Sequence, residues 1–109
     1  MENIIYNELL IRGYNVDVGV VETREGNNRK QLEVDFVCNQ GNRRYYIQSA
    51  LNLDTPEKTL QETKSLNNIG DSFKKIIVVK DNIKLWRNDD GILIIAIQEF
   101  LLNKNSLVL

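Results

Sequence analysis

The sequence contains no histidine and a single cysteine, Cys38, among its 109 residues. The lack of histidine excludes catalytic Ser-His and Cys-His pairs as well as histidine-ligated zinc. One cysteine excludes a disulfide framework and a cysteine-based zinc site. Because Cys38 continues an apolar strand pattern, we expect an inert, reduced core thiol. The chemistry that remains open uses carboxylates, lysine, tyrosine or a hard cation.

The sequence also lacks a long apolar run, a secretory signal peptide and a large excess of either charge. No apolar stretch approaches the roughly 20 residues of a membrane-spanning helix, and Met1-Glu2-Asn3 does not begin a signal peptide. We therefore expect a cytoplasmic protein without a membrane partner. Fourteen Lys and Arg against fifteen Asp and Glu give a net charge of −1, which does not favour nucleic-acid binding. The length predicts a single domain over residues 1–109.

Hydrophobic periodicity predicts a helix and then three strands joined by turns in the first half of the chain. Ile5, Leu9 and Arg12 follow helical spacing, and Gly13 stands where a C-terminal cap belongs. The helix is therefore predicted over residues 2–12. Alternating apolar and polar residues predict three strands, over residues 15–21, 31–38 and 44–51. Polar, glycine-containing segments predict the two turns between them, at residues 23–30 and 39–42.

The second half begins with a strong helix-start signal. In Asp54-Thr55-Pro56-Glu57 a capping residue precedes proline and an acidic first turn, which predicts a helix up to about Asn67. Two apolar runs then predict buried strands at 75–80 and 92–97, followed by a short helix at 98–102. The order α-β-β-β-α-β-β-(α) predicts an α/β fold with a mixed sheet and helices on its faces.

Asp35 and Gln48 are the residues whose placement suggests chemistry. Alternation predicts two faces for the strand 31–38, with Leu32, Val34, Phe36 and Cys38 on one and Glu33, Asp35 and Val37 on the other. Gln48 lies opposite Ile47 on the next strand, so a hairpin would bring Asp35 and Gln48 close together. Carboxylate and amide oxygens suit Mg²⁺, which polarises a phosphoryl oxygen and activates bound water. The alternatives are a solvated Asp35 and a buried Gln48 amide bonded to Asp35.

These residues resemble the PD-(D/E)XK nuclease superfamily, which has the restriction-endonuclease-like fold. In its archaeal Holliday-junction-resolvase branch, a helical Glu precedes a Gly-aromatic pair, an Asp follows on one strand, and Glu-x-Lys lies on the next. Here Glu2 precedes Gly13-Tyr14, and Asp35 precedes Gln48-Ser49-Ala50. The resemblance implies that Glu2, Asp35 and Gln48 occupy the superfamily's catalytic positions, with Asp35 and Gln48 as ligands for any metal.

Three segments of the sequence resemble one subgroup of this superfamily still more closely. Glu-Asn-Ile-Ile-Tyr-Asn-Glu-Leu-Leu-Ile-Arg-Gly-Tyr, Glu-Val-Asp-Phe-Val and Tyr-Ile-Gln-Ser-Ala are similar to the C-terminal domain of a family of prokaryotic AAA+ ATPases, domain of unknown function 4143. This resemblance covers nearly the whole chain. It implies a fragment of a longer protein, preceded by an ATPase domain and a winged-helix-like region, so that Met1 need not be the natural start. It also makes that ATPase domain the expected partner, with DNA as a second one.

No Gly-x-x-x-x-Gly-Lys-[Ser/Thr] phosphate loop occurs in these residues, so ATP is expected only in the missing domain. Two departures weaken the nuclease site itself. Gln48 brings no charge to a cation, and Ala50 stands where the superfamily has the lysine that orients or activates water. Lys58 or Lys64 on the predicted crossover helix is the candidate replacement. Mg²⁺ is the one cofactor that the site suggests.

We therefore predict a degenerate, non-catalytic nuclease-like module of an AAA+ ATPase, serving nucleic-acid recognition or interdomain assembly. One alternative is an active Mg²⁺-dependent DNA endonuclease with a relocated lysine, and another is a pure protein-interaction module. Glu2 is also favoured simply as a carboxylate at a helix N-terminus. Basic residues crowd the two predicted turns as either a solvated rim or a phosphate-binding patch: Arg24, Arg29, Lys30, Arg43 and Arg44.

Predictions can also be made for four further side chains. Glu8 is predicted to be solvated, because it points away from the apolar stripe of the first helix. Tyr45 and Tyr46 are expected on opposite faces of their strand. Trp86, in a polar connection, either anchors a short strand or contacts the ATPase domain.

Overall fold

A computed structural model of the chain describes residues 1–108, with the side chains of all but residues 20, 21, 23–25 and 30. Its helices are α1 (Glu2–Ile11), α2 (Pro56–Asn67), α3 (Ile97–Leu102) and the 3-10 turn η1 (Ser106–Val108). Its strands are β1 (Asn15–Glu25), β2 (Asn28–Gln40), β3 (Arg43–Ala50), β4 (Lys74–Val79), β5 (Trp86–Arg87) and β6 (Leu93–Ala96). None of the described helices is long and apolar enough to cross a membrane.

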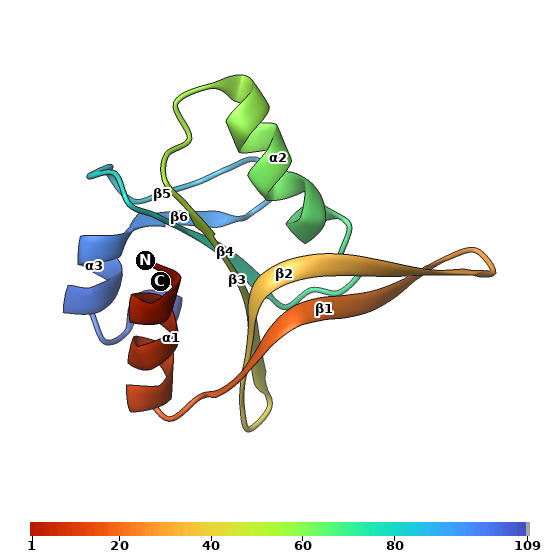
Figure 1. Cartoon of the computed structure of the whole chain (residues 1–109), viewed down its shortest axis with the longest axis horizontal. Helices are drawn as coiled ribbons and strands as arrows, with labels where there is room; N and C mark the ends of the chain where they lie inside the picture. The colour runs from red at the N-terminus through yellow and green to blue at the C-terminus, as the bar shows by residue number, and fades with distance from the viewer. Residues whose placement is uncertain (109) are drawn as a thin grey trace.

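All the strands belong to one mixed sheet in the order β1-β2-β3-β4-β6-β5 (Figure 1). The first three strands pair antiparallel, β4 pairs parallel with β3 and with β6, and β5 pairs antiparallel with β6. One core cluster joins the sheet to α1, α3 and η1, and a second joins the opposite face to α2. The predicted mixed α/β architecture, with helices on both faces, is therefore confirmed.

Local signals explain the helix starts and the central strands. The Thr55 hydroxyl accepts the Lys58 backbone N–H at 3.2 Å, and Pro56 occupies the first helical position, as predicted for α2. Ile5 and Leu9 of α1 are fully buried. Ile76 to Val79 of β4 and all of β6 are apolar and buried, because helices cover both faces of the sheet there.

The first hairpin is longer than its predicted turn. Residues 23–30 were expected to form that turn, but β1 and β2 continue pairing to Glu25 and Asn28, which leaves only Gly26 and Asn27 between them. Gly26 has a φ of +62°, a conformation that suits a tight hairpin turn. Figure 1 shows this end of the hairpin extending away from the rest of the molecule. Polar residues can form this part of the hairpin because the hydrogen bonds between the two strands involve backbone groups and do not require buried side chains.

An irregularity in β2 overturns the predicted faces of that strand. The β1–β2 register shifts between Asp17 and Gly19, opposite the segment from Val34 to Val37. Leu32 and Val34 consequently pack in the α2-side core, whereas Phe36 and Cys38 pack in the α1-side core. The prediction that these four residues share one face is wrong, because one extra residue in a strand reverses the alternation beyond it. Asp35 lies at this reversal.

Several smaller predictions can be compared directly. Tyr45 and Tyr46 lie in opposite core clusters, as predicted. Trp86 forms the edge strand β5 by pairing with Ile94, which agrees with the first of its two interpretations. Cys38 is fully buried, and burial raises the pKa of its thiol to about 12, as befits an inert core residue.

Candidate functional site

Asp35 and Gln48 lie together where β2 leaves β3. Pairing of these strands runs as far as Phe36 and Ile47, directly beside the two residues. There the Asp35 backbone N–H donates to Gln48 Oε1 at 2.7 Å, and the Ser49 backbone N–H donates to Asp35 Oδ2 at 2.8 Å. Side-chain oxygens thus accept the backbone N–H groups at the point where the strands separate.

Ser49 connects this pair to the first helix. Its hydroxyl oxygen lies 3.0 Å from Asp35 Oδ2 and 3.3 Å from Glu2 Oε1, and its single proton can be donated to either carboxylate. Glu2 sits in the first turn of α1, where the helix dipole favours a negative charge. The structure therefore brings Glu2, Asp35 and Gln48 together around Ser49; we call these four residues the Asp35 junction.

Glu62 of α2 adds a further negative charge near the junction. Burial raises the pKa of Glu62, and the charge of Asp35 raises it further. Glu62 was not predicted, because its approach to Asp35 depends on the packing of α2. The Ser49 hydroxyl was not predicted either, although strand alternation places Ser49 on the α1 side.

The fit of this junction to a metal ion is limited. Gln48 Oε1, a predicted ligand, already accepts the Asp35 N–H and has one lone pair left. Within residues 1–108, as far as their side chains are described, no group of three or more His, Cys, Asp or Glu is arranged to hold a metal ion. If Mg²⁺ binds, Asp35 and Gln48 are the residues that would hold it, with one negative charge between them.

Both candidate replacement lysines lie on α2. Lys58 Nζ donates to Asn52 Oδ1 at 2.9 Å and pairs with Asp54 at 3.0 Å, so it is held at the start of its own helix. Lys64 is exposed in the last turn of α2. Ala50 is buried in the α2-side core, where its methyl group packs against apolar residues.

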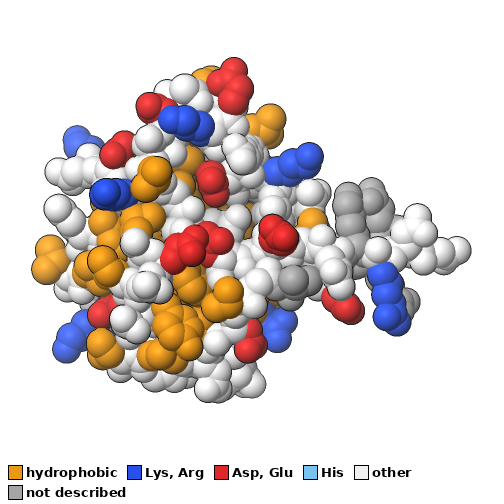
Figure 2. All heavy atoms as spheres, in the orientation of Figure 1, with side chains coloured by type: hydrophobic (Ala, Val, Ile, Leu, Met, Phe, Trp, Pro, Cys, Tyr) orange, Lys and Arg blue, Asp and Glu red, His pale blue; other side chains and the backbone are white. Residues whose placement is uncertain are grey.

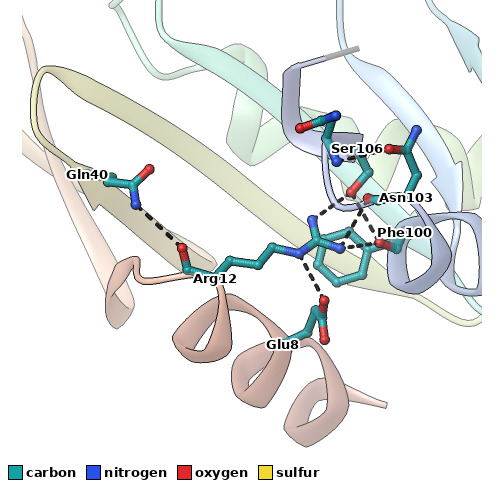
Figure 3. Close-up of polar contacts among 7 residues, drawn as sticks. Glu8, Arg12, Gln40, Phe100, Asn103 and Ser106 are labelled. Carbon is teal, nitrogen blue, oxygen red and sulfur yellow. Dashed lines mark hydrogen bonds and ion pairs between the residues drawn. The ribbon is translucent and has the colours of Figure 1, made fainter.

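A second polar network surrounds Arg12 (Figure 3). Arg12 Nε donates to Glu8 Oε1 at 2.9 Å and Nη1 donates to Ser106 Oγ at 2.8 Å. Nη2 donates to the carbonyl oxygens of Phe100 and Asn103, and the guanidinium lies 4.7 Å from the centre of the Phe100 ring. We call these residues the Arg12 network. The prediction that Glu8 is solvated is wrong, because its side chain is only 20% exposed beside Arg12.

With this geometry established, comparison with known proteins identifies the family. The model of "Domain of unknown function (DUF4143)" matches residues 1–100. The chain belongs to the DUF4143 family. An uncharacterized protein of Haemophilus influenzae is 35% identical to this DUF4143 chain over 102 residues, which cover 94% of the chain and 22% of that protein. The chain thus spans about a fifth of the length of this curated relative.

Two solved structures share the fold of the DUF4143 chain. Protein VC1899 from Vibrio cholerae superposes with a TM-score of 0.66 at 15% identity, covering 97% of this chain and 32% of that one. The protein of unknown function AF1548 superposes with a TM-score of 0.53 at 14% identity, covering 87% of this chain and 55% of that one. At these identities the likeness concerns the fold alone.

Proposed function

We propose that this DUF4143 chain is a non-catalytic nuclease-like module of a longer ATPase, with a restriction-endonuclease-like fold, and that it serves assembly with the rest of that polypeptide. The main support is the Asp35 junction. Its oxygens accept hydrogen bonds from the module's own backbone: Gln48 Oε1 from Asp35 and Asp35 Oδ2 from Ser49. A former metal site that has become a strand junction would have this arrangement.

The missing catalytic groups support the same proposal. A working site of this kind needs negatively charged oxygen ligands for its cation and a group that orients or activates water. Gln48 supplies no charge, and the methyl group of Ala50 cannot hold or move a proton. Lys58, one of the two candidate replacements for the lost lysine, is paired with Asp54.

A role in assembly draws on the exposed apolar side chains. Ile11 at the end of α1 is 79% exposed, and Leu102 at the end of α3 is 83% exposed. Figure 2 shows apolar side chains gathered over α1 and α3 on this face of the molecule. Exposed apolar surface of this kind is typical of contacts with another protein or domain. The relative from Haemophilus influenzae is several times longer than this chain, so the remainder of a comparable polypeptide is the proposed partner.

The catalytic part of the proposal can be tested with the 109-residue chain. Supercoiled, linear and branched DNA would be incubated with it in Mg²⁺ or Mn²⁺, with Asp35→Ala as the matched variant. We expect no cleavage beyond background in either protein, and no heat of Mg²⁺ binding by calorimetry. Cleavage by the natural chain that disappears in Asp35→Ala would instead support an active endonuclease.

The assembly part needs the longer polypeptide. Ile11→Ser with Leu102→Ser should expose the connection to this module, so that limited proteolysis releases the module faster than from the unmodified protein. Leu60→Ser, at a 67% exposed position on α2, is the control and should leave the rate unchanged. Equal release rates in all three proteins would contradict assembly through α1 and α3.

A further inference from the structure

A basic hollow of about 320 Å³ lies between the end of α1, the turn from β2 to β3 and the C-terminal segment. Arg12, Arg43 and Lys104 line it, and none of the described residues that line it is acidic. Arg12 is paired with Glu8, so Arg43 and Lys104 supply the local excess of positive charge in a chain whose net charge is −1. Arg43 and the Asp35 junction lie at opposite ends of β3, which makes the hollow independent of the proposed function.

Strand alternation separates Arg43 from its neighbour Arg44. Arg43 is two residues before Tyr45, on the α1 side, and lines the hollow. Arg44 donates to Asn39 Oδ1 at 2.9 Å, and its guanidinium lies 5.8 Å from the centre of the Phe73 ring. Two adjacent arginines therefore have different surroundings, and only Arg43 belongs to the hollow.

Uncharged side chains that can donate hydrogen bonds also line the hollow. The Tyr14 ring meets the Tyr45 ring edge-on at 5.8 Å, and Tyr14 lines the hollow with Gln40 and Asn105. Burial raises the pKa of the Tyr14 hydroxyl, and the charges of Arg12 and Arg43, which line the same hollow, oppose this effect. A protonated tyrosine beside two cations can donate a hydrogen bond to an anion.

We propose that this hollow binds a phosphate group, held by Arg43 and Lys104 with the Tyr14 hydroxyl as a further donor. Guanidinium and ammonium groups make charge-assisted hydrogen bonds to phosphate oxygens. Arg12 contributes positive charge, although its donors are occupied by Glu8 and the C-terminal segment. Water takes up about 30 Å³ per molecule, so the hollow has room for a phosphate and part of the molecule that carries it. The phosphate belongs either to a small phosphorylated molecule or to the end of a nucleic-acid strand.

Calorimetric titration of the 109-residue chain at low salt tests this proposal. The probes are inorganic pyrophosphate, adenosine monophosphate, and a single-stranded oligonucleotide with and without a 5′-phosphate. We expect Arg43→Ala and Lys104→Ala each to weaken binding about tenfold or more. Arg44→Ala, which removes the same charge one residue away, should change the affinity less than about twofold. Tyr14→Phe should cause a smaller loss than Arg43→Ala.

Each outcome decides between specified alternatives. Binding of the monophosphate at least as tight as that of the oligonucleotide assigns the hollow to a small molecule. Tighter binding of the oligonucleotide only when it carries the 5′-phosphate assigns the hollow to a strand end. Equal losses in Arg43→Ala and Arg44→Ala would overturn the proposal, as would no binding of any probe. Urea unfolding of each variant establishes that the compared proteins are folded, and Arg43→Gln serves if Arg43→Ala is not.

Discussion

The Arg12 network and the Asp35 junction both join distant parts of the chain, but the charge at the centre of each has the opposite sign and different surroundings. In the Arg12 network a cation is surrounded by acceptors: the Glu8 carboxylate, the Ser106 hydroxyl and the carbonyl oxygens of α3 and its C-cap. In the Asp35 junction an anion receives neutral donors from Ser49, while Glu2 and Glu62 bring further negative charge near it.

This difference separates a network in which the central charge is balanced from one in which it is not. The Arg12 side chain is 8% exposed, and a charge buried to this degree must be paired and hydrogen-bonded to be tolerated. Asp35 is partly exposed. Its hydrogen-bond donors are neutral, so they do not cancel the repulsion between its carboxylate and those of Glu2 and Glu62. The comparison teaches that hydrogen bonding alone does not identify a site, since both networks have it; the balance of charge distinguishes them.

Arg12→Ala removes the cation at the centre of the Arg12 network and should have the largest effect on the free energy of unfolding. Removing the cation leaves Glu8 and the carbonyl oxygens of Phe100 and Asn103 without their partner. We expect the free energy of unfolding, measured in urea, to fall by about 3–5 kcal/mol. Arg29→Ala, at an exposed position near the hairpin tip, is the control, and its effect should stay within about 0.5 kcal/mol. A loss below about 1 kcal/mol for Arg12→Ala would contradict the stabilising role.

Asp35→Ala tests the other network and should have an intermediate effect. The substitution removes the acceptor of the Ser49 N–H, so the free energy of unfolding should fall by about 1–3 kcal/mol. Asp35→Asn keeps an acceptor oxygen, and its loss should be smaller than that of Asp35→Ala. An increase in stability in Asp35→Ala would mean that repulsion among the carboxylates outweighs the hydrogen bonds.

Gln48→Glu sharpens the comparison by adding a third carboxylate to the junction, next to that of Asp35. A pair of carboxylates holds Mg²⁺ better than a carboxylate and an amide. We expect millimolar Mg²⁺ to raise the thermal midpoint of this variant by a few degrees and to leave that of the natural chain unchanged. Gln31→Glu, on the exposed part of β2, is the control for nonspecific effects of charge. No shift in Gln48→Glu would show that this geometry no longer suits a cation.

The smallest expected effect concerns the pKa of Glu62. Asp35→Asn removes a nearby negative charge, so this pKa should fall toward the ordinary value of 4.5 without reaching it, because burial is the larger cause of the rise. The stabilising contribution of protonated Glu62 is fully present below its ordinary pKa and is lost as the pH rises through its folded pKa. A carboxyl titration by NMR, with Asp54→Asn as the comparison, measures the change. An unaltered pKa in Asp35→Asn would show that the charge of Asp35 does not act on Glu62.

Much of the fold follows from local signals, and the exceptions have physical causes. Thr55 and Pro56 mark the start of α2, and the apolar run from Ile76 to Val79 marks β4, because capping and burial depend on nearby residues. The reversal of faces at Asp35 could not be predicted, since a bulge is decided by the pairing of β2 with β1. A short strand at Trp86 was only one of two interpretations for a similar reason: β5 exists only as a partner of β6.

The candidate site could likewise be predicted only in part from the sequence. The resemblance to nucleases selected Glu2, Asp35 and Gln48, and the fold brings these residues together around Ser49. The contribution of Glu62 depends on the packing of α2, which no short motif encodes. Helical spacing identified Arg12 as part of the buried stripe of α1, but its partners lie 88 to 94 residues away in the chain. Spacing within one helix cannot reveal partners at that distance.

The Arg12 network also affects when the molecule can finish folding during its synthesis. When synthesis has reached Ala96, all the strands of the sheet exist, but Phe100, Asn103 and Ser106, which accept hydrogen bonds from the Arg12 guanidinium, do not. Until then Arg12 has the Glu8 carboxylate as its partner but lacks these acceptors. Contacts over such long separations are slow to form, so we expect α1 to dock late, once α3 and η1 have been made.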